Sequence, residues 1–374
     1  MSFVVLTALL QSAVLAAEPA PRIDPEGDPT LRDVSADGAP TITPHLLVQT
    51  WATLYDMDTA DQADPAGYGD PEDDIGFKVR RARLGFTGAW GRYDYAMVFG
   101  VSSGADPLLS ADQNPRVDII DAWAGYTFGD ADKVTARVSA GSQRVPYGRE
   151  NLLSTGALVF QERTVASNHL GPFRDAGVLA DVRKGGARLR VGAFNGNDSY
   201  LGDDDPGLLL AARAEYSQGE DVYSTWGEVE SLTLGVAGDF MFNPQFATTT
   251  MTYGGDVILR VKGLALLIEG HAAQITPNSD GITDPSVFAT TNQWGGYAQL
   301  GYTIGAWEPA ARVEIFDDST AATDNGDLMH VTAGATAHLL EDHLRLGGGY
   351  VLRMERGGES LPNDTVRLWG QVKF

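Results

Sequence analysis

The last nine residues of the chain alternate, with a period of two, between two kinds of side chain. One face carries Val366, Leu368, Gly370, Val372 and Phe374, and the other carries Arg367, Trp369, Gln371 and Lys373. A period of two is typical of a strand that lies between an apolar and a wet environment. A soluble sandwich could use such a strand once. A transmembrane barrel uses such strands throughout, because every backbone N–H and C=O group within lipid has to be paired inside a closed sheet.

The same alternation recurs along most of the chain. From residue 41 onward we predict about sixteen strands of roughly 9–12 residues, the length that a tilted strand needs to cross a bilayer. Clear examples are residues 45–54, 81–87, 93–102, 134–143 and 329–339. No apolar stripe of helical period and helical length competes with them. The pattern favours an all-β chain.

The gaps between these strands alternate between tight turns and long loops. The tight turns fall at residues 90–92, 129–132, 184–186, 262–263, 305–306 and 341–342. The long gaps are residues 56–76, 104–116, 144–173, 195–206, 276–292, 317–326 and 355–362. The alternation predicts a short turn at residues 217–230, although the gap there is longer than the other tight turns. This asymmetry predicts a transmembrane antiparallel β-barrel with short periplasmic turns and long extracellular loops.

The chain divides into three predicted parts. Residues 1–17 are nearly all apolar or small, and Ala13, Val14, Leu15, Ala16 and Ala17 resemble a signal-peptidase site. No Lys or Arg precedes the apolar core of this segment, so a short buried helix is the alternative. Residues 18–40 are acidic and rich in Pro and Gly, which predicts a flexible segment. Residues 41–374 form the predicted outer-membrane β-barrel.

Composition excludes several classes of protein. The chain has no cysteine, which argues against a disulfide-stapled module and against thiolate metal sites. The net charge of −23 argues against a nucleic-acid partner, which would need a basic stripe. The acidic residues concentrate in the long gaps, where a solvated loop is the simplest interpretation. We expect no cofactor and no metal.

Aromatic residues gather beside the predicted tight turns. They are Trp90, Tyr93, Tyr126, Phe128, Tyr302, Trp307 and Phe374. Taken singly, each could be an ordinary core residue. As a set, they are typical of the aromatic girdle at a membrane interface.

If the apolar faces meet lipid, a row of arginines faces the lumen. It consists of Arg81, Arg83, Arg137, Arg188, Arg190, Arg213, Arg260, Arg312, Arg345 and Arg367. Several acids accompany it, namely Asp94, Asp121, Glu215, Asp256, Glu269 and Glu314. Pairs between the two sets could simply brace the wall. Alternatively, a guanidinium row offers planar, multi-donor contacts to carboxylate or phosphate and would attract anions.

The gap at residues 144–173 differs from the others because it is not acidic and contains apolar residues of the kind that become buried. We expect it to fold inward and constrict the pore. Arg144, Arg149 and Arg163 would supply charge at that constriction. The anchors that hold the loop to the wall would be Glu150, Glu162, Arg174 and Asp175.

Several motifs in sequence order resemble the phosphate-selective porin O and P family of Gram-negative outer membranes. They are FKVRRARLGF at residues 77–86, VDIIDAW at 117–123, GSQRVPY at 141–147 followed by Glu150, FQER at 160–163, PFRDAGV at 172–178 and VGAFNG at 191–196. The similarity covers roughly residues 75–200. It implies a sixteen-stranded barrel, a homotrimer, a third loop folded into the pore, and passive diffusion of solutes with some preference for anions. The third loop here has arginines but no lysine, unlike the best-known phosphate-specific members.

The leading functional hypothesis is a passive outer-membrane channel for small hydrophilic solutes, with some preference for anions such as phosphate. Its expected partners are outer-membrane lipid, small anionic or polar solutes and the barrel-assembly machinery, which would read the terminal Phe374. One alternative is an adhesion or assembly platform, or a cation-binding surface, with little role in transport. A barrel-borne enzyme is the other, but the six histidines are scattered and no Gly-x-Ser-x-Gly elbow accompanies them.

Overall fold

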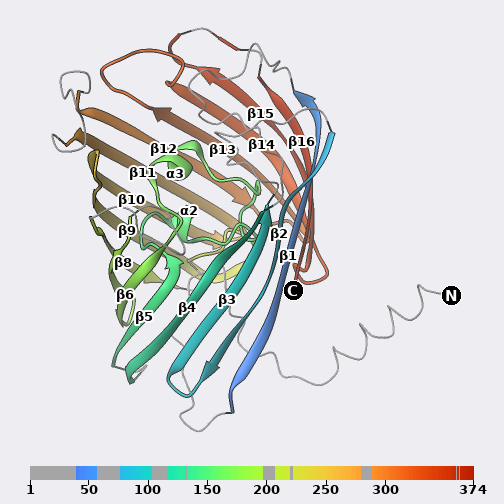
Figure 1. Cartoon of the computed structure of the whole chain (residues 1–374). Coiled ribbons are helices and arrows are strands. Elements are labelled where there is room, and N and C mark those ends of the chain that lie inside the picture. The colour runs from blue at the N-terminus through green and yellow to red at the C-terminus, as the bar shows by residue number, and fades with distance from the viewer. Residues whose placement is uncertain are drawn as a thin grey trace.

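The computed structural model describes residues 39–56, 76–102, 116–130, 133–196, 207–219, 222–278, 289–358, 360–361 and 363–374. In this part of the chain, sixteen antiparallel strands close into one barrel, with β1 pairing with both β2 and β16 (Figure 1). The predicted fold is confirmed. The division at residues 17 and 40 lies in or beside the segment outside the described residues and stays a prediction.

The strands follow one another around the barrel in sequence order. They are β1 (Thr41–Asp56), β2 (Gly76–Trp90), β3 (Tyr93–Ser102), β4 (Arg116–Asp130), β5 (Val134–Arg144), β6 (Arg174–Lys184), β7 (Ala187–Phe194), β8 (Leu209–Gln218), β9 (Val229–Pro244), β10 (Thr248–Lys262), β11 (Leu264–Pro277), β12 (Thr291–Tyr302), β13 (Trp307–Asp317), β14 (Leu328–Leu339), β15 (Leu344–Glu355) and β16 (Thr365–Lys373). Two short helices, α2 (Arg149–Leu152) and α3 (Val165–Leu170), lie between β5 and β6. No helix in the described ranges is both long enough and apolar enough to span a membrane.

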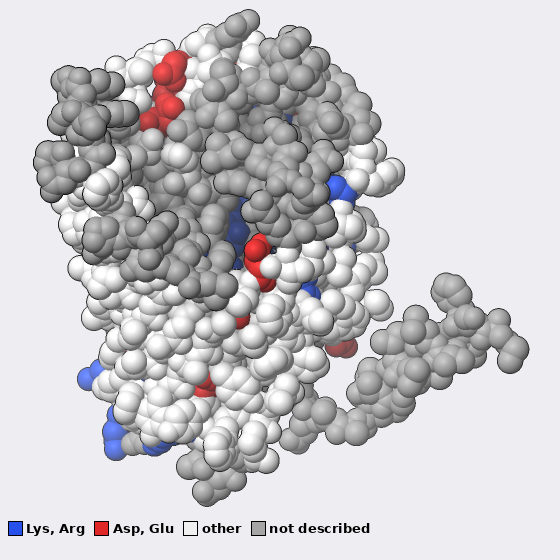
Figure 2. Space-filling model, in the orientation of Figure 1, with Lys and Arg blue, Asp and Glu red and all other residues white. Residues whose placement is uncertain are grey.

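The outer wall is apolar because alternate residues of each strand point outward. Val138, Leu189 and Leu300 are exposed there, whereas the residues immediately before and after each of them are buried. Figure 2 shows a broad part of this wall without charged side chains. Such a surface suits lipid and would be costly in water.

Aromatic side chains on this wall lie beside the tight turns, as predicted. Trp90, Tyr93, Phe128, Tyr302 and Trp307 are all exposed. The rings of Tyr93 and Tyr126 pack edge to face with centroids 4.9 Å apart. This belt marks the end of the barrel at which the tight turns lie, the lower end in Figure 1.

The expected asymmetry between the two ends has two exceptions. At the tight-turn end, β8 ends at Gln218 and β9 begins only at Val229. The prediction of a short turn between these strands is therefore wrong. At the opposite end, the connection from Pro244 to Thr248 is tight, and Gln245 N donates to Thr248 O at 2.8 Å. The longer segment between β8 and β9 carries Val222 and Trp226, and it folds into the lumen, where Val222 is buried against Ile258 and Leu267.

Candidate functional site

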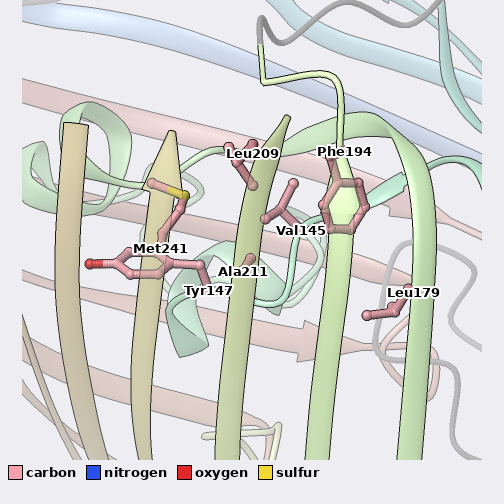
Figure 3. Close-up of a cluster of buried hydrophobic side chains, with 7 residues drawn as sticks. All are labelled: Val145, Tyr147, Leu179, Phe194, Leu209, Ala211 and Met241. Carbon is pink, nitrogen blue, oxygen red and sulfur yellow. The ribbon is translucent and has the colours of Figure 1, made fainter. Parts of the chain in front are cut away.

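The lumen is crossed by residues 145–173, here called the inner loop, which leave β5 after Arg144 and return at Arg174. Val145 and Tyr147 are fully buried, and α2 and α3 lie inside the barrel (Figure 1). The loop begins in an apolar cluster, where Val145 and Tyr147 pack against Phe194, Leu209 and Met241 of the wall (Figure 3). Burial of these side chains explains why this gap folds inward.

The next part of the loop is anchored to β10 and β11. Arg149 Nε donates to Asp256 Oδ1 at 2.5 Å, and both side chains are fully buried. The backbone N–H of Glu150 donates to Glu269 Oε2 at 2.9 Å. Gly148 precedes α2 with φ +68, and a Cβ there would lie 2.8 Å from Glu269 Oε1. A glycine is therefore required at this turn.

The middle of the loop reaches the opposite wall. Gln49 Nε2 on β1 donates to Thr155 O at 3.0 Å, and Gln371 Nε2 on β16 donates to Gly156 O at 3.0 Å. Phe160 packs edge to face on Trp369 with centroids 6.3 Å apart. These contacts satisfy loop carbonyl groups that would otherwise be buried without partners.

The return to β6 is held by a network around Glu150. Its Oε2 accepts hydrogen bonds from Thr164 N at 2.9 Å and Thr164 Oγ1 at 2.8 Å. Arg174 forms a two-pronged pair with Asp121 at 2.9 and 3.0 Å, and Asp175 accepts from the backbone of Gly196. Glu150, Arg174 and Asp175 all contact neighbouring groups in the lumen, and their role as anchors stays a prediction.

Six guanidinium groups converge where the loop passes β1, β2, β13 and β16, and they are called here the arginine cluster. The cluster consists of Arg80, Arg81, Arg83, Arg163, Arg312 and Arg367. Arg80 and Arg81 pair with Glu162 at 2.9 and 2.8 Å. Within the described chain, these six guanidiniums contact three carboxylates, those of Glu162, Glu150 and Glu314.

Glu162 stays ionised inside the cluster. Burial alone would raise its pKa, but the guanidiniums of Arg80 and Arg81 lower that pKa to about 2. Arg163 shows the cost of crowding like charges, because burial and the nearby Arg174 and Arg83 lower its pKa to about 10. Both groups remain charged at neutral pH.

Other arginines of the predicted lumen row brace the wall. Arg137 pairs with Asp94 at 2.8 Å, Arg188 with Asp181 at 2.9 Å, and Arg213 with Asp239 at 2.8 Å. Arg190 lies 3.6 Å from Glu215. These four face the lumen as expected, but each lies beside a carboxylate of the wall and outside the arginine cluster.

The three arginines expected at the constriction make different contacts. Arg163 belongs to the arginine cluster and donates to the backbone oxygens of Glu150 and Leu153. Arg144 donates to Asn151 O at 2.5 Å and clamps the start of the loop. Arg149 is fully buried in its pair with Asp256. The role of all three at a constriction stays a prediction.

Sequence reasoning missed Arg80, because strict alternation would place its side chain on the outer face of the strand, away from Arg81. A β-bulge shifts the register so that Gln49 pairs with Arg81 but Thr50 pairs with Val79. The extra residue brings Arg80 inward beside Arg81. The same reasoning missed Trp51, whose ring is buried. Lys78 Nζ lies 5.0 Å and Arg367 Cζ 4.0 Å from the centroid of this ring, as cation–π contacts.

A closed, lipid-facing barrel with a long loop folded across its lumen defines the class of outer-membrane channels. The family model described as "Phosphate-selective porin O and P" matches residues 55–232, which confirms the resemblance seen in the motifs. This family and this fold are those of channels and point to a bacterial outer membrane.

Solved structures share the fold at low sequence identity. An anion-selective porin from Comamonas acidovorans is 12% identical with a TM-score of 0.59, and the match covers 90% of this chain and 100% of that one. The outer membrane channel DcaP of Acinetobacter baumannii is 14% identical with a TM-score of 0.55, over 90% of this chain and 97% of that one. OmpT of Vibrio cholerae is 9% identical with a TM-score of 0.57, over 92% of this chain and 100% of that one. No curated protein sequence matches this chain.

Proposed function

We propose that this protein is a passive outer-membrane diffusion channel with a preference for small anions. The observation that carries the proposal is the arginine cluster, in which six guanidiniums gather where the inner loop crosses the lumen. Fixed positive charge in a narrow, low-dielectric passage lowers the energy of an anion and raises that of a cation.

Two further observations support this preference. Guanidinium groups keep their charge and carry more N–H donors than one carboxylate can accept, so a passing anion can share them. One structural neighbour is an anion-selective porin, and the matched family is described as phosphate-selective. We infer that chloride and phosphate are both solutes, and competition between them in conductance measurements would rank them.

Reversal potential in a planar bilayer under a salt gradient tests the proposal. We expect the unmodified channel to favour the anion, and Arg163→Gln to shift the reversal potential toward cation preference. Lys133→Gln is the matched control, since it removes one positive charge from an exposed turn far from the cluster. Absence of conductance would contradict a channel, and cation preference would contradict the role of the arginines.

The remaining parts of the proposal concern biogenesis. We infer that residues 1–17 are a signal peptide, that three copies assemble, and that the barrel-assembly machinery recognises Phe374. The exposed apolar wall supports membrane insertion and leaves room for subunit contacts. Native mass spectrometry of detergent-extracted protein would give both the subunit number and the mature N-terminus.

A further inference from the structure

Residues 222–227, here called the turn segment, fold into the lumen from the tight-turn end. Val222 O accepts from Arg149 Nη1 at 2.7 Å, so the segment touches the inner loop. Arg260 Nη2 donates to Trp226 O and Gly227 O, each at 2.9 Å. The indole of Trp226 stacks on the imidazole of His338 with centroids 4.3 Å apart and planes 19° apart. The segment is therefore fixed against the wall on two sides.

A chamber of about 890 Å³ lies between the turn segment and the inner loop. It belongs to the tight-turn end, because the β6–β7 and β14–β15 turns border it. Its volume is within the range of about 300–1,000 Å³ that is typical of small-molecule sites. The chamber is thus large enough to hold one small solute in addition to conducting water.

One side of the chamber is apolar. Leu152 and Leu153 of the inner loop line it together with Val222, Tyr223 and Trp226 of the turn segment. A passage that served inorganic ions alone would gain nothing from such a lining, since apolar surface gives an ion no hydrogen bonds. An apolar body of a solute would gain by leaving water there.

The other side of the chamber is charged, and two of its carboxylates, those of Asp342 and Glu215, are bound by neighbouring donors. Asp342 accepts from Arg345 Nε at 2.5 Å, lies 2.7 Å from Lys373 Nζ, and contacts His338 Nδ1 at 2.7 Å. Glu215 accepts from Tyr223 and from Arg213. A cationic ligand would compete with these donors. Arg345 carries five N–H donors, and its bonds to Asp342 use Nε and Nη2, so an anion would add an acceptor for this guanidinium.

The aromatic and basic parts of the lining are adjacent. His338 contacts the ring of Trp226 on one side and Asp342 on the other, and Asp342 holds Arg345 and Lys373. A single small molecule in the chamber can therefore contact both the indole of Trp226 and the basic side chains of Arg345 and Lys373.

We propose that this chamber is a binding site for amphipathic organic anions, such as aromatic carboxylates. The carboxylate of the bound anion lies beside Arg345 and Lys373, and the apolar part of the same molecule lies against Trp226 and the leucines of the inner loop. The proposal rests on the proposed channel function in one respect, since the solute reaches the chamber through the lumen. It deepens that function by naming a solute class and placing its site on the tight-turn side of the loop.

Titration calorimetry on the detergent-solubilised full-length protein tests the site with four probes. They are benzoate, neutral benzamide, cationic benzylamine and inorganic phosphate. We expect benzoate to bind at least about tenfold more tightly than the other three, because only benzoate combines a ring with a negative charge. This series uses the unmodified protein and so does not depend on how any variant folds.

Two variants then locate the site. Trp226→Ala and Lys373→Gln should each weaken benzoate binding by about tenfold. Trp307→Ala and Lys262→Gln are the matched controls, since both residues are exposed at the same end of the barrel and outside the chamber. The controls should leave benzoate binding unchanged.

The proposal is overturned if benzoate does not bind, if benzamide or phosphate binds as tightly, or if the two chamber variants bind benzoate like the controls. Failure of the proposed function looks different, because it appears as a missing or cation-selective current in the absence of benzoate. Anion-selective current without benzoate binding would reject the chamber alone.

Discussion

Glu162 is the carboxylate on which Arg80 and Arg81 converge, and it offsets part of the positive charge of the arginine cluster. Replacing it with Gln removes one negative charge while keeping the shape of the side chain. We therefore expect Glu162→Gln to increase anion preference, seen as a larger reversal potential of the same sign. Glu228→Gln, an exposed substitution at the tight-turn end, is the control. An unchanged reversal potential would remove Glu162 from the ion path.

The pH dependence of the same residue follows from its pKa. The neighbouring guanidiniums lower the pKa of Glu162 from 4.5 to about 2, against the effect of burial. Its ion pairs therefore contribute fully above about pH 4.5 and are lost only as pH falls through about 2. We expect Glu162 to cause no change in the anion preference of the unmodified channel between about pH 7 and 5. A selectivity step near pH 5 that disappears in Glu162→Gln would contradict this.

Asp256 anchors α2 through buried ion pairs. It pairs with Arg149 at 2.5 Å and with Arg213 at 2.7 Å, and all three side chains are fully buried. Asp256→Asn leaves two buried guanidiniums short of a partner, a change that costs about 3–5 kcal/mol in comparable cases. Arg149→Met leaves Asp256 still paired with Arg213 and should cost less.

Urea unfolding of the refolded barrel in detergent micelles would measure both changes. The ranking of the two free energies of unfolding is the test, because the absolute values depend on the detergent. An Arg149→Met variant less stable than Asp256→Asn would show that the anchor depends on the guanidinium and its bond to Val222 O.

At the scale of elements, the turn segment and the inner loop occupy the lumen from opposite directions. Replacing residues 222–227 with a Gly-Ser segment of equal length would remove the side chains that fill the tight-turn end. The ladders of β8 with β9 and of β9 with β10 would remain. We expect single-channel conductance to increase. The control is the same replacement at residues 319–324, which are exposed or partly exposed in the β13–β14 connection.

An unchanged conductance in the turn-segment variant, with normal folding, would place the narrowest point of the pore elsewhere. The control replacement should have no effect on conductance, since the contacts of residues 319–324 lie at the opposite end of the barrel.

The sequence predicted these elements to different degrees, for identifiable reasons. The inner loop was predicted because apolar residues such as Leu152 and Phe160 stood out in a long gap. The turn segment carried the same signal in Val222, Tyr223 and Trp226, which the expectation of a short turn obscured. Arg80 carried no such signal, because a β-bulge has no clear mark in the alternation of a strand. Arg149 could be placed on the loop, but its burial depends on acids of β8 and β10 that are distant in sequence.

At the scale of the whole molecule, the barrel exists only if β1 and β16 meet. Their register pairs Val48 with Val372 and Trp51 with Trp369, so residues more than 300 positions apart close the sheet. Such a contact has a high entropic cost and forms late unless something holds the ends together. The strand pattern predicted closure, and the pairing fixes which residues accomplish it.

Phe374 lies at this seam. Its backbone N–H donates to Leu46 O at 2.9 Å, and Leu46 N donates back to Phe374 O at 3.1 Å. Phe374 is 54% exposed, and its ring stacks on that of His343 with centroids 5.5 Å apart. The exposed side chain is therefore available to an assembly factor.

We expect deletion of Phe374 to reduce the amount of folded protein in the outer membrane several-fold, and to leave the conductance of the channels that do form unchanged. Gel mobility of unheated membrane extracts would measure the folded fraction, and planar bilayers would measure conductance. Phe374→Trp, which keeps an aromatic terminus, should assemble normally and is the control. If the deletion variant assembles normally, the two backbone bonds to Leu46 and the ring of Phe374 are dispensable, and closure depends on the ladder between Leu47 and Lys373 onward.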